Sequence, residues 1–124
     1  MIPRVVLIVE DDEAIGTLIV DAINSETGYQ AILATDGAIA LELTQSMQVD
    51  LFLLDIGLPD MTGIELHDRV RAEDRFRHTP VLFVSASTNE HAKELAARGA
   101  ATFLPKPFEL GALLDLVRWL APAA

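Results

Sequence analysis

The sequence predicts an α/β fold: a single-domain, doubly wound, five-stranded parallel sheet with helices on both faces. Short apolar runs alternate five times along the chain with segments of helical spacing. Several of these runs are apolar at every position, as expected of parallel strands that are covered on both faces. The chain has 124 residues, a length that suits one compact domain.

The strands are expected at the runs richest in Val, Ile, Leu and Phe. In chain order these runs are Arg4–Val9, Gln30–Ala34, Leu51–Leu54, Val81–Val84 and Thr102–Leu104. The helices are expected in between and after them, mostly where apolar residues recur every three or four positions. They are Ala14–Ile23, Ala38–Met47, Ile64–Val70, Ser87–Arg98 and Leu110–Leu120. Trp119 lies among leucines in the last helix, and we predict that it belongs to the core.

Local signals mark the ends of three helices. Asp12 precedes the first helix and is interpreted as its N-cap, in preference to a metal ligand. Asp60 and Thr62 follow Pro59 and are interpreted as turn and helix-start residues. Gly99 is expected to end the fourth helix.

Composition argues against several classes of function. The chain has no cysteine, which excludes a disulfide framework, a thiolate metal site and a thiol nucleophile. The net charge of −10 argues against direct binding to nucleic acid. The apolar runs are too short for membrane insertion, and no signal-peptide pattern precedes them, so we expect a cytoplasmic protein. The three histidines follow no ligand spacing, which argues against a zinc site.

Polar residues follow four of the five expected strands. Glu10 and Asp11 follow the first, Asp55 the third, Ser85 the fourth and Lys106 the fifth. Ligands of open parallel sheets bind beyond the carboxyl ends of the strands, so these side chains are expected to share one site.

The residue types in this set favour phosphoryl chemistry. Oxygen ligands without His or Cys favour a hard cation such as Mg²⁺. A lysine and a hydroxyl opposite the cation would hold a small tetrahedral anion, and a carboxylate beside them is a plausible nucleophile. The residues therefore suggest Mg²⁺-dependent phosphorylation of an aspartate.

The chain resembles the receiver domain of two-component response regulators, in its stand-alone form. The resemblance extends from Arg4 to Leu120 and rests on four motifs in register: VLIVEDD, LFLLDIGLPDMTG, VLFVSAS and FLPKPF. It implies a flavodoxin-like sheet with strand order 2-1-3-4-5. It also implies one receiver domain over residues 1–124, with no effector domain.

The resemblance further implies a role for each site residue. Asp55 matches the phosphoacceptor and Lys106 the lysine that contacts the phosphoryl group, with a cis bond to Pro107. Asp11 and Asp55 would bind Mg²⁺, or Mn²⁺ in its place, together with the backbone carbonyl of Gly57. Glu10 would act on the metal through water.

The family pattern also implies a switch and its partners. Ser85 matches the switch hydroxyl and Phe103 the aromatic rotamer switch, although Phe103 lacks the hydroxyl of a tyrosine. The phosphoryl donor would be a histidine kinase or a histidine phosphotransfer protein. The face formed by the fourth helix, fifth strand and fifth helix would act on an unidentified downstream protein. Such a domain catalyses only its own phosphorylation and dephosphorylation.

Three other functions fit the sequence less well. A Mg²⁺-dependent phosphatase that passes through an aspartyl-phosphate would need a second acid at Gly57 and a cap over its substrate. A pseudo-receiver that binds partners without phosphorylation would not need the full acidic set and Lys106. A nucleotide-binding fold would need glycines where carboxylates follow the first strand.

Overall fold

The computed structural model describes residues 2–86, 90–99 and 102–124. Five parallel strands form one sheet in the order β2-β1-β3-β4-β5. The strands are β1 Arg4–Val9, β2 Tyr29–Ala34, β3 Leu51–Leu54, β4 Val81–Ser85 and β5 Phe103–Pro105. The predicted fold class and strand order are both confirmed.

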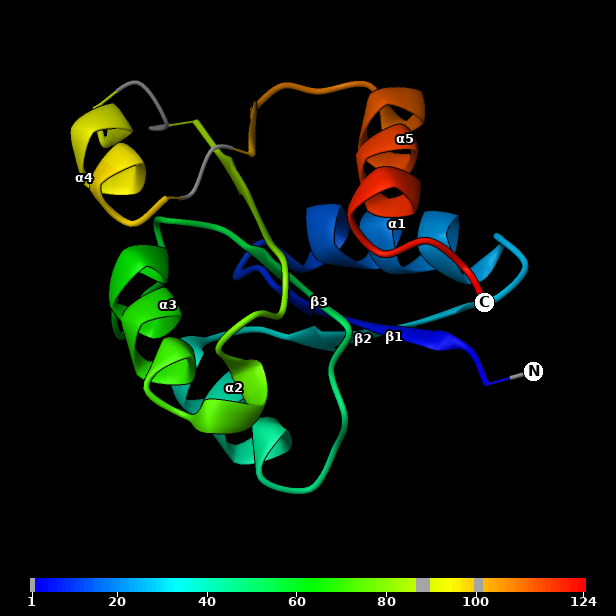
Figure 1. The fold of residues 1–124 in the computed structure, drawn as a ribbon. Coiled ribbons are helices and arrows are strands. Elements are labelled where there is room, and N and C mark those ends of the chain that lie inside the picture. Colours follow the sequence, from blue (N-terminus) through cyan, green and yellow to red (C-terminus); the bar gives the residue numbers. More distant parts are fainter. Residues whose placement is uncertain (1, 87–89, 100–101) are drawn as a thin grey trace.

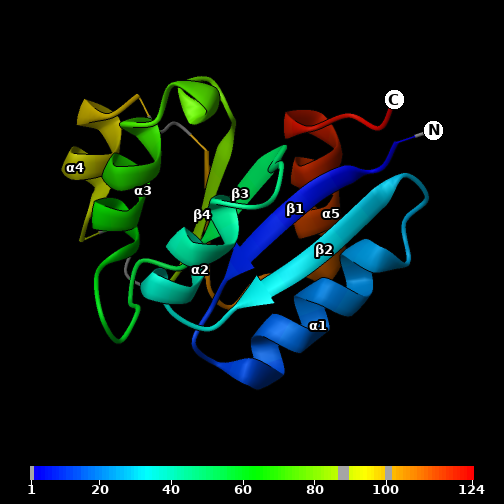
Figure 2. The same cartoon turned by 90° about the horizontal axis from the view of Figure 1, so that it is seen from below.

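Within the described residues, five α-helices and one short 3₁₀ helix lie in the connections and after β5. They are α1 Glu13–Asn24, α2 Gly37–Thr44, α3 Gly63–Arg71, η1 Asp74–Phe76, α4 Ala92–Ala97 and α5 Leu110–Leu120. Helices α1 and α5 lie on one side of the sheet, and α2, α3 and α4 lie on the other (Figures 1 and 2). None of these helices is long and apolar enough to cross a membrane.

The sheet separates two apolar cores, because successive side chains of a strand point to opposite faces. One core joins Leu7, Phe52 and Phe83 to residues of α2, α3 and α4. The other core joins strand residues that point to the opposite face, such as Ile8, Leu53 and Leu82, to Ile19 of α1 and Val117 of α5. The central strands are buried on both faces, which explains their unbroken apolar sequences.

The helix-end predictions are confirmed. Asp12 accepts hydrogen bonds from the backbone N–H groups of Ala14 and Ile15 and caps α1. Thr62 caps α3 by accepting from the N–H of Glu65. Gly99 follows α4 with φ +68°, a conformation that glycine adopts without strain.

Two helices are shorter than predicted. The second helix ends at Thr44 and does not reach Met47; the Thr44 hydroxyl donates to the carbonyl of Leu41 in its last turn. The fourth helix was predicted from Ser87, which lies outside the described residues, and α4 begins at Ala92. Helix α4 buries Leu95 and no other side chain.

The prediction that Trp119 lies in the core is wrong. Its side chain is 71% exposed. Helix α5 packs on the sheet through Leu113 and Val117, and Trp119 lies two residues after Val117, on the opposite side of the helix.

Candidate phosphoacceptor and metal site

The register of the sheet brings the predicted site residues to one edge. Val9 of β1 pairs with Leu54 of β3, so the residues that follow them, Glu10 and Asp55, emerge at the same level. At the same carboxyl edge, in the next two strands, Ser85 of β4 pairs with Pro105 of β5, which directly precedes Lys106. The backbone N–H of Lys106 also donates to the carbonyl of Ser85 (3.2 Å).

Three carboxylates meet at this edge. Glu10, Asp11 and Asp55 each offer an oxygen atom, and these atoms lie within 4.8 Å of one another. Glu10 is 2% exposed and Asp55 7% exposed, whereas Asp11 is exposed to solvent. Buried carboxylates repel one another unless a proton or a cation lies between them. An all-oxygen donor set with one side open to water fits a hard divalent cation such as Mg²⁺.

Lys106 joins the two buried carboxylates. Its Nζ donates to Glu10 Oε1 (2.5 Å) and to Asp55 Oδ2 (3.1 Å). Burial disfavours the charged form of Lys106, but the bonds to Glu10 and Asp55 outweigh burial and raise its pKa. The ammonium group therefore stays charged and neutralises part of the acidic cluster.

The two buried carboxyls differ in their affinity for a proton. Burial, and then the hydrogen bond to Asp55, raises the pKa of Glu10 to about 7. Burial also acts to raise the pKa of Asp55, but hydrogen bonds with Glu10, Lys106 and the N–H of Gly57 outweigh it and lower that pKa. Glu10 is therefore the carboxyl of the pair that takes up a proton first as pH falls, and Asp55 remains an ionised carboxylate at neutral pH, as a nucleophile requires.

The loop after β3 holds Asp55 in place. The N–H of Gly57 donates to Asp55 Oδ1 (3.2 Å), and the N–H of Gly63 donates to the carbonyl of Ile56 (2.8 Å). A Cβ atom on Gly63 would collide with the carbonyl oxygen of Asp55. The first residue of α3 must therefore be small so that the helix can pack against the backbone of the acidic residue.

The two residues predicted to act as a switch lie on neighbouring strands. Ser85 is 3% exposed at the end of β4. Phe103 is the first residue of β5 and is 39% exposed, although its partner in the sheet, Phe83, is fully buried. Lys106 and Pro107 are joined by the cis peptide bond that the family pattern implied.

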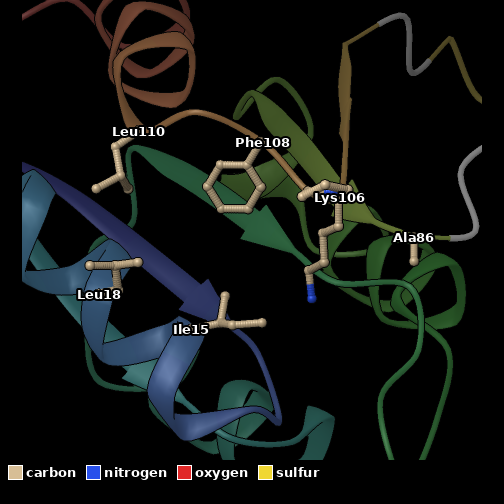
Figure 3. Close-up of a pocket in the computed structure, with 7 residues that line it drawn as sticks. Ile15, Leu18, Ala86, Lys106, Phe108 and Leu110 are labelled. Atoms are coloured by element: carbon tan, nitrogen blue, oxygen red, sulfur yellow. The ribbon is translucent and has the colours of Figure 1, made fainter.

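Beside the acidic cluster lies an apolar groove, which we define by Ile15, Leu18, Phe108 and Leu110, with Lys106 at one end. Its volume is about 390 Å³, and Ala86 and Pro107 complete its wall. The ring of Phe108 faces the α1 side chains (Figure 3), and Leu18 is 52% exposed. This groove was not predicted from the sequence. The only feature of the sequence that pointed to it is that the first helix has apolar side chains on both its inner and its outer side.

The fold and the site together define a class of protein. A five-stranded parallel domain with an acidic cluster and a lysine at the carboxyl edge is the arrangement of a signalling receiver domain. The sequence model of the response regulator receiver domain matches residues 6–118. The chain belongs to this family.

Known relatives support the assignment along nearly the whole chain. The polar-differentiation response regulator DivK of Brucella anthropi is 32% identical over 117 residues, 94% of each protein. The sensor histidine kinase TmoS of Ectopseudomonas mendocina is 39% identical over 107 residues, which are 86% of this chain and 11% of TmoS. The chemotaxis response regulator CheY4 of Vibrio cholerae has 31% identity and a TM-score of 0.87, covering 95% of this chain and 98% of CheY4.

Proposed function

We propose that this protein is a phosphorylation-controlled switch that accepts a phosphoryl group on Asp55 from a phosphohistidine. The observation that carries the proposal is the contact between Lys106 and Asp55, which belongs to a carboxylate cluster that could hold a divalent cation. In the transfer, an Asp55 carboxylate oxygen bonds to phosphorus as the P–N bond breaks. The electron pair of that bond returns to the imidazole of the donor.

The residues around Asp55 would each contribute to this step. Asp11, Asp55 and the carbonyl of Gly57 would hold Mg²⁺, with Glu10 acting through water. Mg²⁺, when bound, would neutralise charge on the phosphoryl oxygens. Lys106 Nζ already contacts Asp55 Oδ2 and would move its hydrogen bonds onto a phosphoryl oxygen.

The apolar groove beside Lys106 suits the protein that delivers the phosphoryl group. Because Lys106 belongs to both the groove and the site, a partner seated in the groove would reach Asp55. No Lys or Arg occurs from Val5 to Asp68, so α1, which lines one side of the groove, carries acidic side chains and no basic ones. We infer a partner helix with apolar side chains flanked by Lys or Arg, borne by a histidine kinase or a histidine phosphotransfer protein.

The proposed output is a rearrangement of α4 and β5. Ser85 would turn toward the phosphoryl group, Phe103 would turn inward, and the α4-β5-α5 face would change its affinity for a downstream protein. The half-exposed ring of Phe103 and the single buried side chain of α4, Leu95, are consistent with elements that lose little burial when they move. We further propose that the protein is located in the cytoplasm, as expected from the sequence.

The test is phosphorylation followed by intact mass. Incubation with Mg²⁺ and a small phosphodonor such as acetyl phosphate should add one phosphoryl group to the protein. The gain should disappear in Asp55→Asn and remain in Asp12→Asn, which changes a neighbouring carboxylate that only caps α1. Absence of any gain, or a gain that survives in Asp55→Asn, would overturn the proposal.

A further inference from the structure

Asp60 lies in the loop between β3 and α3, close after Asp55, and connects this loop to helix α2. Its Oδ1 accepts a hydrogen bond from the N–H of Gly37 (2.9 Å), and its Oδ2 accepts one from the N–H of Ala38 (2.9 Å). These are the first two N–H groups of α2, and they belong to residues that lie 23 and 22 positions before Asp60 in the chain. Both carboxylate oxygens are therefore used to attach the tip of the loop to α2.

Helix α2 has a separate N-cap of its own. Asp36 accepts a hydrogen bond from the N–H of Ile39 (2.8 Å). Most helix starts are capped by one local side chain, so the contribution of Asp60 comes in addition to the usual cap. The bonds to the α2 N–H groups, led by Gly37, lower the pKa of Asp60, which keeps it ionised and acidic at neutral pH.

The residue next to Asp60 strengthens the same attachment. Met61 packs over Gly37 so closely that a Cβ atom there would lie 2.5 Å from the Met61 sulfur. Met61 is also partly buried against the core that α2, α3 and α4 share. The tip of the loop is thus held by one polar and one apolar contact with the start of α2.

The base of the same loop holds the phosphoacceptor. Gly57 donates its N–H to Asp55 and forms an isolated antiparallel bridge with Thr62. Among the residues that the structure describes, none apart from Gly57 and its two chain neighbours has an atom within 4 Å of the position of a Cβ on Gly57. Because Gly57 gains little support from packing, its place depends on the restraints at the two ends of the loop.

We propose that Asp60 is a positioning residue for the site: by holding the loop against α2, it fixes the Asp55 carboxylate and the Gly57 backbone where Mg²⁺ requires them. This inference rests on the proposed function, because it assigns Gly57 and Asp55 to the metal. Asp60 does not touch the site and acts only through the loop.

The test compares Asp60→Ala with Asp36→Ala. Both variants remove a cap from α2, but only the first releases the loop. Mg²⁺ titration followed by NMR should show affinity about tenfold weaker in Asp60→Ala and unchanged in Asp36→Ala. Amide hydrogen exchange of Gly57 should accelerate in the Asp60 variant alone, whereas urea unfolding should show a loss of stability in both. Asp60→Asn keeps one acceptor oxygen and should lie between wild type and Asp60→Ala.

Two results would overturn the inference. One is wild-type Mg²⁺ affinity and wild-type Gly57 exchange in Asp60→Ala. The other is an equal change in Asp36→Ala, which would show that both residues only stabilise α2. If the wild type takes up neither Mg²⁺ nor a phosphoryl group, the proposed function fails. Unchanged Gly57 exchange in Asp60→Ala would then refute the restraint on the loop as well, and faster exchange would uphold it.

Discussion

Mg²⁺ binding should depend on pH through Glu10. Burial, and then the hydrogen bond to Asp55, raises the pKa of Glu10 to about 7, while the pKa of Asp55 is lowered. Below about pH 7, a cation that enters the cluster would therefore have to displace a proton from Glu10. Affinity should rise as pH increases, because the ionised form that the cation favours becomes more populated.

The size of the effect follows from the pKa. At about pH 8 a carboxyl with this pKa is roughly 90% ionised, and at about pH 6 it is roughly 9% ionised. The apparent affinity for Mg²⁺ should therefore fall about tenfold between these two conditions. The number of protons released on binding should be about 0.1 at about pH 8 and should rise to about 0.9 at about pH 6.

Isothermal titration calorimetry in two buffers of different ionisation enthalpy measures both quantities. The control is Glu10→Gln, which keeps a side chain of similar size but cannot titrate. Its affinity should be weaker than that of the wild type and nearly independent of pH. The reasoning is refuted if wild-type affinity does not change between about pH 6 and pH 8. It is equally refuted if Glu10→Gln shows the same slope.

Three further predictions concern stability. Burial lowers the pKa of His67, so the unfolded chain binds a proton more readily; the free energy of unfolding should fall as pH drops below about 6.5. Urea unfolding should show a smaller fall in His67→Gln, and an equal fall would contradict this. Gly63→Ala should destabilise by about 2 kcal/mol through its collision with Asp55, whereas Gly111→Ala, which meets no neighbour, should not. Trp119→Gln should change thermal stability by less than about 0.5 kcal/mol, since the ring is mostly exposed; a larger loss would show that it packs against the domain.

The sequence alone predicted the order of the strands and helices and which polar residues would meet at one edge of the sheet. Continuous apolar runs can be buried on both faces only in a covered parallel sheet, and three of the five strands, β1, β3 and β4, show this pattern. Because every parallel strand ends at the same edge, the residues after these runs could be placed together without coordinates. Short-range signals such as the Asp12 and Thr62 caps were equally readable, since a cap acts within its own helix turn.

Apolar content alone did not predict burial for single side chains. Trp119 was assigned to the core because of its leucine neighbours, but helix α5 turns it away from the sheet. The same limit applies to Leu18, which is not buried under α1 but lines the apolar groove together with Phe108. Which face of a helix is covered depends on what packs against it.

Tertiary structure alone decided how the carboxylates share their charge. Glu10 and Asp55 are similar acids in the sequence. In the folded protein, burial and the hydrogen bond with Asp55 raise the pKa of Glu10, whereas hydrogen bonds with Glu10, Lys106 and the N–H of Gly57 lower the pKa of Asp55. Asp60 likewise was read as a turn residue, and its bonds to α2 are invisible until the chain folds. Local sequence specifies each element, but pKa values and long-range hydrogen bonds depend on distances between elements, and these are set only when the sheet and its helices pack together.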